Sequence, residues 1–366
     1  MKYCIVTTTI NVPRLLSAYV EDCRHFGHDC VFVVVGDKQT PRAAETYCKT
    51  LAKRTGTEIV YMDVLDQERY LARFPELRRY LPYRSVQRRN VGLLYAYERG
   101  ADVLVTIDDD NFLQTKNFLG AHRLGRSSLD VARARDGWFN VCSFLREKNK
   151  REFFHRGTPL EARFMQGGVR MQKKEVYVAV NAGLWLEDPD IDALTRLYFL
   201  GNPIRSIAYS RKKNFALAPQ TWSPFNSQNT ALAREVLPAY FLSPTVGRYD
   251  DIFGSYVVRR IADHLGHAVS YGFPLVAQHR NPHNHWKDFL ELEATGHRLV
   301  GVFTVALRSI RVVGRDYHAC YSEIIRSLPK ALFSTGKTLT AEERAYFLGY
   351  VSGMKVWHAT FDRILV

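Results

Sequence analysis

Three consecutive carboxylates, Asp108, Asp109 and Asp110, follow directly after the apolar run VLVTI at 103–107. Like charges at the end of a buried strand repel one another, so they are tolerated where water reaches them or where a cation neutralises them. A strand that is apolar throughout needs cover on both faces, which places it inside a parallel or mixed α/β sheet. Ligands of such sheets bind beyond the carboxyl ends of the strands.

The triplet has the donor atoms of a site for a hard divalent cation. Carboxylate oxygens suit Mg²⁺ or Mn²⁺, and a substrate diphosphate fills the remaining coordination positions in many such sites. The alternative is an acidic turn between the strand and the next segment, with no metal involved. From the triplet alone both interpretations stay open.

Further polar residues stand beside predicted strands and helices. Asp37 follows a strand and a glycine, where a carboxylate can accept a hydrogen bond from a ribose hydroxyl or a base N–H, although plain turn chemistry explains it equally well. Arg88 and Arg89 lie on the helix before the acidic strand. One of them can reach a phosphate or the triplet, because the guanidinium donates two parallel hydrogen bonds. The alternative is a surface charge.

A second acidic pair and a histidine come later in the chain. Asp250 and Asp251 start a predicted helix, where the helix dipole favours them without catalysis. They can also act as a general base or anchor sugar hydroxyls. His279 follows an apolar strand and is either structural or a third ligand of a carboxylate-bound metal. The order of these features matches metal-assisted handling of a nucleotide diphosphate sugar.

The elements that must position these residues alternate along the first part of the chain. We predict strands at 4–9, 31–35, 59–62 and 103–107, separated by helices that include one at 85–99 ending at Gly100. This alternation predicts an α/β fold with a mostly parallel, doubly wound sheet.

The later segments are predicted to be less regular in the middle and helical at the end. The turn-rich stretch 136–244 is expected to supply substrate loops and to contain strands at 176–179 and 184–186. A helix is predicted at 250–265, and two more in 317–366, separated at 334–336.

Composition limits the class of protein. The chain has 366 residues, of which 46% are hydrophobic and 24% charged, an ordinary globular mix. It has no 18-residue apolar run, so we expect no membrane span. Six cysteines without a CxxC pair favour reduced thiols in the cytoplasm and argue against a zinc site. The net charge of +14 favours anionic partners, but no nucleic-acid-binding motif organises the basic clusters.

The sequence resembles the reversibly glycosylated polypeptides, the UDP-arabinopyranose mutase family. The resemblance runs in matching order over most of the chain. The segments that carry it are VTIDDDNF, HRGTPLEAR, GLWLEDPDIDALTRL, GRYDDIFGSYVVRRIADHLG, YGFPLVAQHRNPHN, CYSEIIRSLPKAL and VWHATFDRIL. The third and fourth of these are long and specific, whereas the acidic triplet alone is not.

This resemblance implies a GT-A-like, Rossmann-related fold with a doubly wound mixed sheet. It implies a nucleotide-sugar-binding catalytic domain at 1–300 and a C-terminal helical extension at 301–366 packed on it. The implied cofactor is Mn²⁺ or Mg²⁺, and the implied substrate is UDP-arabinose or another UDP-pentose. A homo-oligomer and an anionic acceptor are left open.

The resemblance also assigns roles to individual residues. The implied metal ligands are Asp108, Asp110 and His279. The implied nucleotide-sugar-binding residues are Thr8, Asp37, Arg89, Asp108, Asp109, Trp185 and Asn229. The implied catalytic residues are Arg156, Asp250 and Asp251, with Arg156 at the position of the arginine that becomes reversibly glycosylated in the family. Because arginine stays protonated, clamping the diphosphate is the physical alternative for Arg156.

The chain departs from the family pattern near the expected sugar. Ala182 replaces a histidine, Thr158 replaces an aromatic residue, and PFNSQN replaces a cysteine-containing segment. Three functions therefore stay open. The first is cleavage of the sugar–diphosphate bond of a UDP-pentose, for pyranose/furanose interconversion or self-glycosylation. The second is glycosyl transfer to a separate, anionic or neutral acceptor, and the third is non-catalytic binding of a nucleotide sugar.

Overall fold

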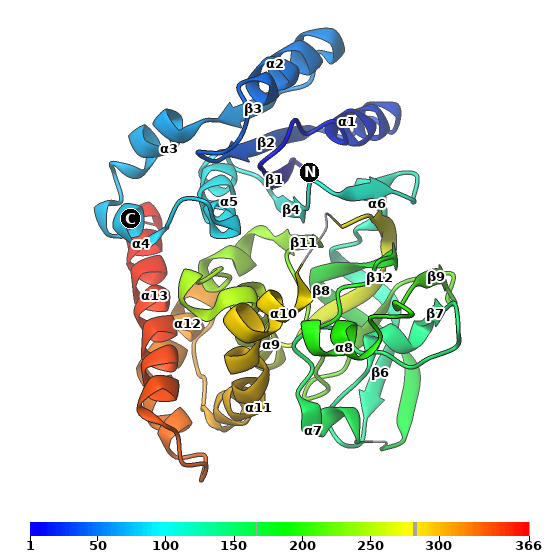
Figure 1. Cartoon of the computed structure of the whole chain (residues 1–366), viewed down its shortest axis with the longest axis vertical. Coiled ribbons are helices and arrows are strands. Elements are labelled where there is room, and N and C mark those ends of the chain that lie inside the picture. Colours follow the sequence, from blue (N-terminus) through cyan, green and yellow to red (C-terminus); the bar gives the residue numbers. More distant parts are fainter. Residues whose placement is uncertain (166, 281–283, 366) are drawn as a thin grey trace.

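A computed structural model describes residues 1–165, 167–280 and 284–365 and shows a mixed α/β molecule (Figure 1). In chain order the strands are β1 (Tyr3–Thr9), β2 (Cys30–Gly36), β3 (Ile59–Met62), β4 (Val103–Ile107), β5 (Asn111–Leu113), β6 (Gly125–Ala134), β7 (Leu145–Glu147), β8 (Val169–Glu187), β9 (Ser206–Tyr209), β10 (Phe215–Leu217), β11 (Asn229–Ala233) and β12 (His267–Gln278).

The helices separate and cover these strands. They are α1 (Leu16–His25), α2 (Ala43–Thr55), α3 (Val64–Leu71), α4 (Pro75–Tyr80), α5 (Arg89–Glu98), α6 (Phe118–Ala121), α7 (Leu160–Arg163), α8 (Ala193–Tyr198), α9 (Asp250–Leu265), α10 (His285–Lys287), α11 (Ala294–Ser309), α12 (Tyr317–Phe333) and α13 (Ala341–Leu365). Short helical turns lie at Val86–Arg88, Val141–Phe144, Arg234–Ala239, Pro244–Tyr249 and Asp288–Glu293.

One sheet runs through the molecule, with its strands in the order β3-β2-β1-β4-β11-β8-β6-β10-β12-β5. The first four strands are parallel, and β11 pairs antiparallel with β4. The strands β1, β2 and β4 are almost entirely buried, which is why their sequences are apolar throughout. Figure 1 shows α1 and α2 on one side of these strands and α5 on the other. The predicted first four strands are confirmed.

A glycine lets α5 lie directly on the sheet. A Cβ atom at Gly92 would lie 2.6 Å from Val6 Cγ1 and 2.8 Å from Val35 Cγ2, so no larger residue fits without movement. The predicted helix at 85–99 begins as a 3₁₀ turn at Val86–Arg88 and becomes α-helical at Arg89. This turn brings the start of α5 to the carboxyl ends of β1, β2 and β4.

The two strands predicted at 176–179 and 184–186 are parts of one strand, β8, which runs for 19 residues. The prediction was wrong because the segment between them, NAG at 181–183, has the composition of a turn. In the structure the Asn181 side chain accepts a hydrogen bond from His122 and donates one to Ser270 Oγ over 2.9 Å. These contacts satisfy the buried amide inside the sheet.

The C-terminal helices pack on the rest of the molecule. The helix predicted at 250–265 is α9, and the two predicted tail helices are α12 and α13. Helix α13 lies along α4, where Tyr80 Oη donates a hydrogen bond to the Gly349 carbonyl over 3.0 Å. Phe253 of α9 stacks on Phe303 of α11 at 4.2 Å. The predicted α/β class, with a mixed sheet and a C-terminal helical extension, is confirmed.

The structure also bears on the predictions about membrane-spanning helices and about the cysteines. No helix in the described ranges is both long enough and apolar enough to cross a bilayer. All six cysteines are buried and carry free thiols. The domain boundary at residue 300 stays a prediction, and helix α11 runs across it.

Candidate functional site

Two connected cavities open at the carboxyl ends of β1, β2 and β4. The first chamber has a volume of about 300 Å³ and is lined by residues that include Thr8, Gly36, Asp37 and the acidic triplet. The second chamber has a volume of about 560 Å³ and lies toward the start of α9. Five residues line both chambers, namely Arg84, Ser85, Val86, Arg89 and Asp108. The chambers therefore form one cleft that meets at Asp108.

The three carboxylates of the triplet have different surroundings. Asp108 is ion-paired with the Arg89 guanidinium. Asp109 accepts a hydrogen bond from Thr9 Oγ1 over 2.6 Å, and burial raises the pKa of its carboxyl. Burial and the neighbouring Asp108 charge raise the pKa of Asp110 to about 7. The triplet is thus an electrostatically strained group of acids, as the sequence predicted.

Arg89 ties the triplet to the other side of the cleft. Its Nη1 donates to the Ser227 carbonyl over 2.6 Å and to Ser227 Oγ over 2.8 Å, and its Nη2 donates to Thr8 Oγ1 over 3.4 Å. Burial alone would lower the pKa of this guanidinium, but Asp108 offsets it and the pKa is raised. Its neighbour Arg88 instead packs over the Tyr83 ring at 4.3 Å.

Asp37 forms part of the wall of the first chamber. It follows β2, and its Oδ2 accepts a hydrogen bond from the Ser85 backbone N–H over 2.9 Å. Its Oδ1 accepts from the Lys38 backbone N–H over 2.6 Å. These contacts hold the Asp37 carboxylate at the wall of the first chamber, which the 3₁₀ turn at Val86–Arg88 also lines.

Arg156 is the centre of a buried charge network in the second chamber. Its Nε and Nη2 donate to the two carboxylate oxygens of Asp190, each over 3.0 Å. Both terminal nitrogens also donate to Asp251 Oδ1 over 3.2 Å, and Nη1 donates to the Arg248 carbonyl. Burial would lower the pKa of Arg156, but the two aspartates raise it well above its usual range. Arg156 is therefore a fixed cation.

The two aspartates at the start of α9, Asp250 and Asp251, have different hydrogen-bond partners. Asp251 bonds Arg156, and it accepts a hydrogen bond from the Ser227 backbone N–H over 3.0 Å. Asp250 accepts a hydrogen bond from Gln87 Nε2 over 2.7 Å. Burial and the Asp251 charge raise the pKa of Asp250 to about 7. A carboxyl with a pKa near neutral can both take and give a proton at physiological pH.

The backbone of His279 contacts the acidic triplet, and its role as a metal ligand stays a prediction. It directly follows β12, and its backbone N–H donates to the Asp110 carbonyl over 3.3 Å. Its ring packs edge-on against Phe112 at a centroid separation of 4.9 Å. The Asp110 carboxylate accepts a hydrogen bond from Gln278 Nε2, which lies 3.4 Å from Oδ1.

Trp185 and Asn229 lie in the core and line neither chamber. Trp185 of β8 packs against the His155 ring at 5.0 Å. Asn229 of β11 donates a hydrogen bond to the Pro274 carbonyl over 3.0 Å. Contact of either residue with the nucleotide sugar stays a prediction, and in this structure both residues are buried away from the cleft lining.

Sequence reasoning missed several residues of the cleft. Asp190 is fully buried, and its carboxylate accepts hydrogen bonds from Arg156, from Arg280 Nη2 over 3.2 Å and from Asn226 Nδ2 over 2.8 Å. Asp190 stands inside the segment GLWLEDPDIDALTRL and Arg280 directly follows His279, so both had a signal in the sequence. Ser227 stands inside PFNSQN, a segment already noted for its departure from the family pattern, but its contacts with Arg89 and Asp251 depend on the fold.

The triplet fits a hard divalent cation by its donor atoms. Its three side chains are partly exposed and offer carboxylate oxygens, the ligand type of Mg²⁺ and Mn²⁺. Mutual repulsion raises the pKa of Asp110, and a bound cation would relieve it. Such ions are commonly held by one or two carboxylates, with phosphate oxygens and water completing the shell.

An open α/β sheet with carboxylates and arginines gathered at its strand ends is an architecture that binds phosphorylated ligands. A family profile described as "Reversibly glycosylated polypeptide" matches residues 154–364, more than half of the chain. The chain therefore belongs to the reversibly glycosylated polypeptide family, which confirms the resemblance seen in the sequence.

Curated relatives carry the name of one enzyme. UDP-arabinopyranose mutase 3 of Arabidopsis thaliana is 31% identical over 121 residues, which cover 31% of this chain and 33% of that protein. Probable UDP-arabinopyranose mutase 1 of Pisum sativum is 26% identical over 214 residues, which cover 55% of this chain and 54% of that protein. The chain thus spans between a third and about half of the length of these relatives.

Two solved glycosyltransferases align with the chain. The mannosyltransferase PcManGT from Pyrobaculum calidifontis, in complex with GDP-Man and Mn²⁺, covers 98% of this chain and 86% of its own, at 10% identity and a TM-score of 0.37. Mouse xyloside xylosyltransferase 1, in its apo form, covers 72% and 74%, at 12% identity and a TM-score of 0.27. Because both TM-scores are low, neither structure supports an inference about activity.

Proposed function

We propose that this protein is a divalent-cation-dependent UDP-sugar enzyme that cleaves the sugar–diphosphate bond of a UDP-pentose, in the manner of a UDP-arabinopyranose mutase. Family membership and the names of the curated relatives support this proposal. The single observation that carries it is the position of Asp108, which lines both chambers and is ion-paired with Arg89.

In this proposal the two chambers hold the two halves of the substrate. The nucleoside lies in the first chamber, where Asp37 accepts a hydrogen bond from its ribose or base. The diphosphate lies where the chambers meet, beside the Arg89–Asp108 ion pair and the other two carboxylates of the triplet. The sugar lies in the second chamber, which contains Arg156, Asp250 and Asp251.

The charges of the cleft then match the charge changes of the reaction. When the bond between the anomeric carbon and the phosphate oxygen breaks, the electron pair stays on the diphosphate, which becomes more negative. Mn²⁺ or Mg²⁺, when bound, supplies positive charge for this leaving group. Arg89 adds a fixed cation in a water-poor site, where electrostatic stabilisation is strongest.

Arg156 has the surroundings of a positioning cation. A nucleophilic guanidinium must give up its proton, but Asp190 and Asp251 hold the pKa of Arg156 well above its usual range. We therefore assign Arg156 to orienting Asp251 and the sugar. The sugar hydroxyl that closes the new ring attacks the anomeric carbon and passes its proton to Asp250, whose pKa is about 7. Asp250 then gives this proton to the old ring oxygen as its bond to the anomeric carbon breaks, and the diphosphate oxygen re-forms its bond to the anomeric carbon.

Glycosyl transfer to a separate acceptor is the second candidate function. The observation that favours it is Arg84, an exposed side chain at the rim shared by both chambers. No side-chain hydrogen bond or ion pair of Arg84 is seen among the residues that the structure describes. A free cation at the entrance can receive an anionic acceptor, and Asp250 would then deprotonate the acceptor hydroxyl.

A product assay separates these functions. The protein is incubated with UDP-arabinopyranose and Mn²⁺, and the nucleotide products are resolved by chromatography. UDP-arabinofuranose as product supports the mutase proposal. Free UDP that forms only with an added acceptor supports transfer instead. Binding without turnover, in protein shown to be folded, would contradict both and leave a nucleotide-sugar-binding protein.

The cation site is tested by Asp110→Asn. This change removes a carboxylate ligand and keeps the shape of the side chain, so we expect calorimetry to show loss of the Mn²⁺-dependent part of UDP binding. Asp29→Asn, in an exposed turn before β2, is the matched control and should bind like the wild type. Unchanged Mn²⁺-dependent affinity in Asp110→Asn would exclude the triplet as the cation site.

A further inference from the structure

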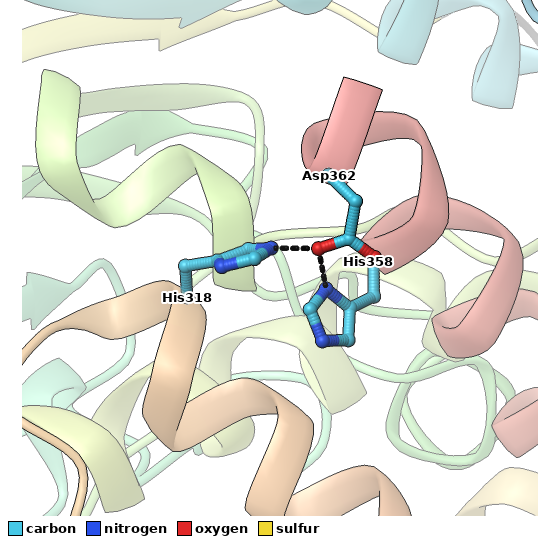
Figure 2. A group of neighbouring side chains, drawn as sticks. All are labelled: His318, His358 and Asp362. Atoms are coloured by element: carbon cyan, nitrogen blue, oxygen red, sulfur yellow. Dashed lines mark ion pairs between the residues drawn. The ribbon is translucent and has the colours of Figure 1, made fainter. Parts of the chain in front are cut away.

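Two histidines and one aspartate form a compact group between α12 and α13, outside both chambers. His318 lies in the first turn of α12, and His358 and Asp362 lie near the end of α13 (Figure 2). One ligand atom from each lies within 4.8 Å of the others. Among the residues that the structure describes, no other group of three His, Cys, Asp or Glu side chains meets this condition.

The distances fit the edges of a metal coordination shell. Asp362 Oδ1 lies 3.1 Å from His318 Nε2 and 3.5 Å from His358 Nδ1. Zn²⁺ binds imidazole nitrogen and carboxylate oxygen at about 2.0 to 2.2 Å, so two ligands of a tetrahedral zinc ion are about 3.3 to 3.6 Å apart. The longer of these two separations falls in this range and the shorter lies just below it, so both are close to the spacing that a shared central ion would impose.

The ring orientations favour a shared centre over two ordinary hydrogen bonds. Both ring nitrogens are shielded from solvent and have no hydrogen-bond partner, although the same carboxylate oxygen lies near each. The oxygen thus lies off the axis along which each nitrogen carries its proton or lone pair. Buried polar atoms normally have a partner, and here a metal ion would satisfy both nitrogens at once.

The spacing along the helix has a simple reason. His358 and Asp362 are four residues apart, so they lie on the same face of α13, one turn from each other. Two ligands at this spacing on one helix form one half of many metal sites. The third ligand comes from the neighbouring helix α12, which packs along α13.

We propose that His318, His358 and Asp362 bind a divalent transition metal ion of the Zn²⁺ class, which clamps the start of α12 to the end of α13. Two imidazoles and one carboxylate form a donor set that suits zinc and not Mg²⁺. Asp362 is half exposed, so water completes the shell on the outer side. This site is separate from the oxygen-donor triplet in the cleft and does not depend on the proposed function.

Zinc binding by the intact, tag-free protein tests the proposal. Zn²⁺ alone is the probe, measured as bound metal per chain after dialysis and as affinity by competition with a chelating dye. We expect the wild type to hold one more zinc ion than His358→Ala, and His358→Ala to lose affinity at this site by about tenfold or more. The buried thiols are not accessible to compete while the protein is folded.

Three other variants make the result decisive. Asp362→Asn keeps the size of a half-exposed side chain and should lose the same zinc ion even if His358→Ala folds poorly. His25→Ala removes an exposed histidine on α1 and should bind zinc like the wild type. Asp110→Asn should also retain the zinc ion, which distinguishes this site from the cleft. Equal zinc binding by the wild type and Asp362→Asn would overturn the proposal.

Discussion

At the scale of single residues, the cleft contains buried carboxylates whose surroundings shift their pKa values in opposite directions. Asp190 is surrounded by two arginines, which offset the cost of burial and hold the pKa of its carboxyl well below its usual range. For Asp250, burial and the charge of the neighbouring Asp251 together raise the pKa of its carboxyl to about 7. Neighbouring acids with pKa values pushed apart are typical of sites that assign one group to binding and another to proton transfer.

The raised pKa of Asp250 predicts that this residue costs stability at neutral and alkaline pH. In the unfolded chain an aspartate loses its proton near pH 3.9, but in the folded protein Asp250 keeps it to about pH 7. Between these values the folded state binds more protons, so the free energy of unfolding falls as the pH rises, and the full penalty is present above pH 7.

We therefore expect Asp250→Asn to be more stable than the wild type at pH 8, by on the order of 2 kcal/mol, and by less at pH 5. The hydrogen bond from Gln87 is retained because the asparagine oxygen also accepts. Thermal unfolding at both values measures this, and turnover should be lost. An equal stability difference at pH 5 and pH 8 would contradict the assignment.

Asp190→Asn tests the charge network by removing the carboxylate that pairs with Arg156 and Arg280. The change leaves Arg156 and Arg280 with too little negative charge in a buried site, so we expect urea unfolding to show a loss of about 3 kcal/mol. The control is Glu45→Gln, which breaks the exposed Glu45–Lys49 ion pair and should cost less than about 0.5 kcal/mol. Similar small losses for both would mean that the network does not hold the second chamber together.

At the scale of elements, short irregular turns decide where the chemistry lies. The 3₁₀ turn at Val86–Arg88 separates Ser85 from Arg89, and both of these residues line both chambers, although an unbroken helix was predicted there. Its N-cap Ser85 accepts from the Gln87 N–H over 3.3 Å, while the Ser85 N–H donates to Asp37. The turn thus joins the end of β2 to the start of α5.

The contact between α13 and its neighbours predicts opposite effects for two glycines on one helix. A Cβ atom at Gly353 would lie 2.4 Å from Tyr80 Oη and 2.8 Å from Phe241 Cε1, whereas at Gly349 its nearest neighbour would be 3.5 Å away. We expect Gly353→Ala to destabilise the protein by about 1 to 3 kcal/mol through overpacking. Gly349→Ala should be neutral or stabilising by up to about 1 kcal/mol, since alanine favours the helix. Chemical unfolding of both variants measures the difference, and equal effects would contradict the close packing of α13.

At the scale of the whole molecule, the C-terminal helices complete the core of the protein. Phe347, Trp357 and Phe361 of α13 are fully buried. Trp357 stacks on Phe241 at 5.3 Å, and its Nε1 donates to the Leu237 carbonyl over 3.2 Å. The extension therefore shares one hydrophobic core with the sheet and its helices.

Removal of residues 341–366 is expected to abolish cooperative unfolding. Each buried aromatic side chain contributes on the order of 2 kcal/mol, and the loss of the set approaches the whole stability of a typical domain. Circular dichroism during heating measures this, with Leu348→Ala, at an exposed position of α13, as the control. A truncated protein with an unchanged transition would show that the extension is dispensable for folding, as an independent domain at 1–300 would require.

Much of this architecture could be predicted from the sequence because it depends on local patterns of residues. Apolar runs that need cover on both faces predicted β1, β2 and β4, and the helical spacing of apolar residues predicted α9, α12 and α13. The acidic triplet was predicted as part of the site because like charges at the end of a buried strand repel one another, and a bound cation would offset that repulsion. Long matching motifs supplied the family, and with it Arg156 and Asp251.

Only the tertiary structure decided which of these residues meet. Asn229 and Trp185 belong to matching segments but lie in the core, because β11 and the inner part of β8 are buried on both faces of the sheet. Asp190, Ser227 and Arg280 join the cleft from loop segments far apart in the chain. The sequence thus determined the chemical groups that are available, while strand order and packing determined their distances, their burial and hence their pKa values.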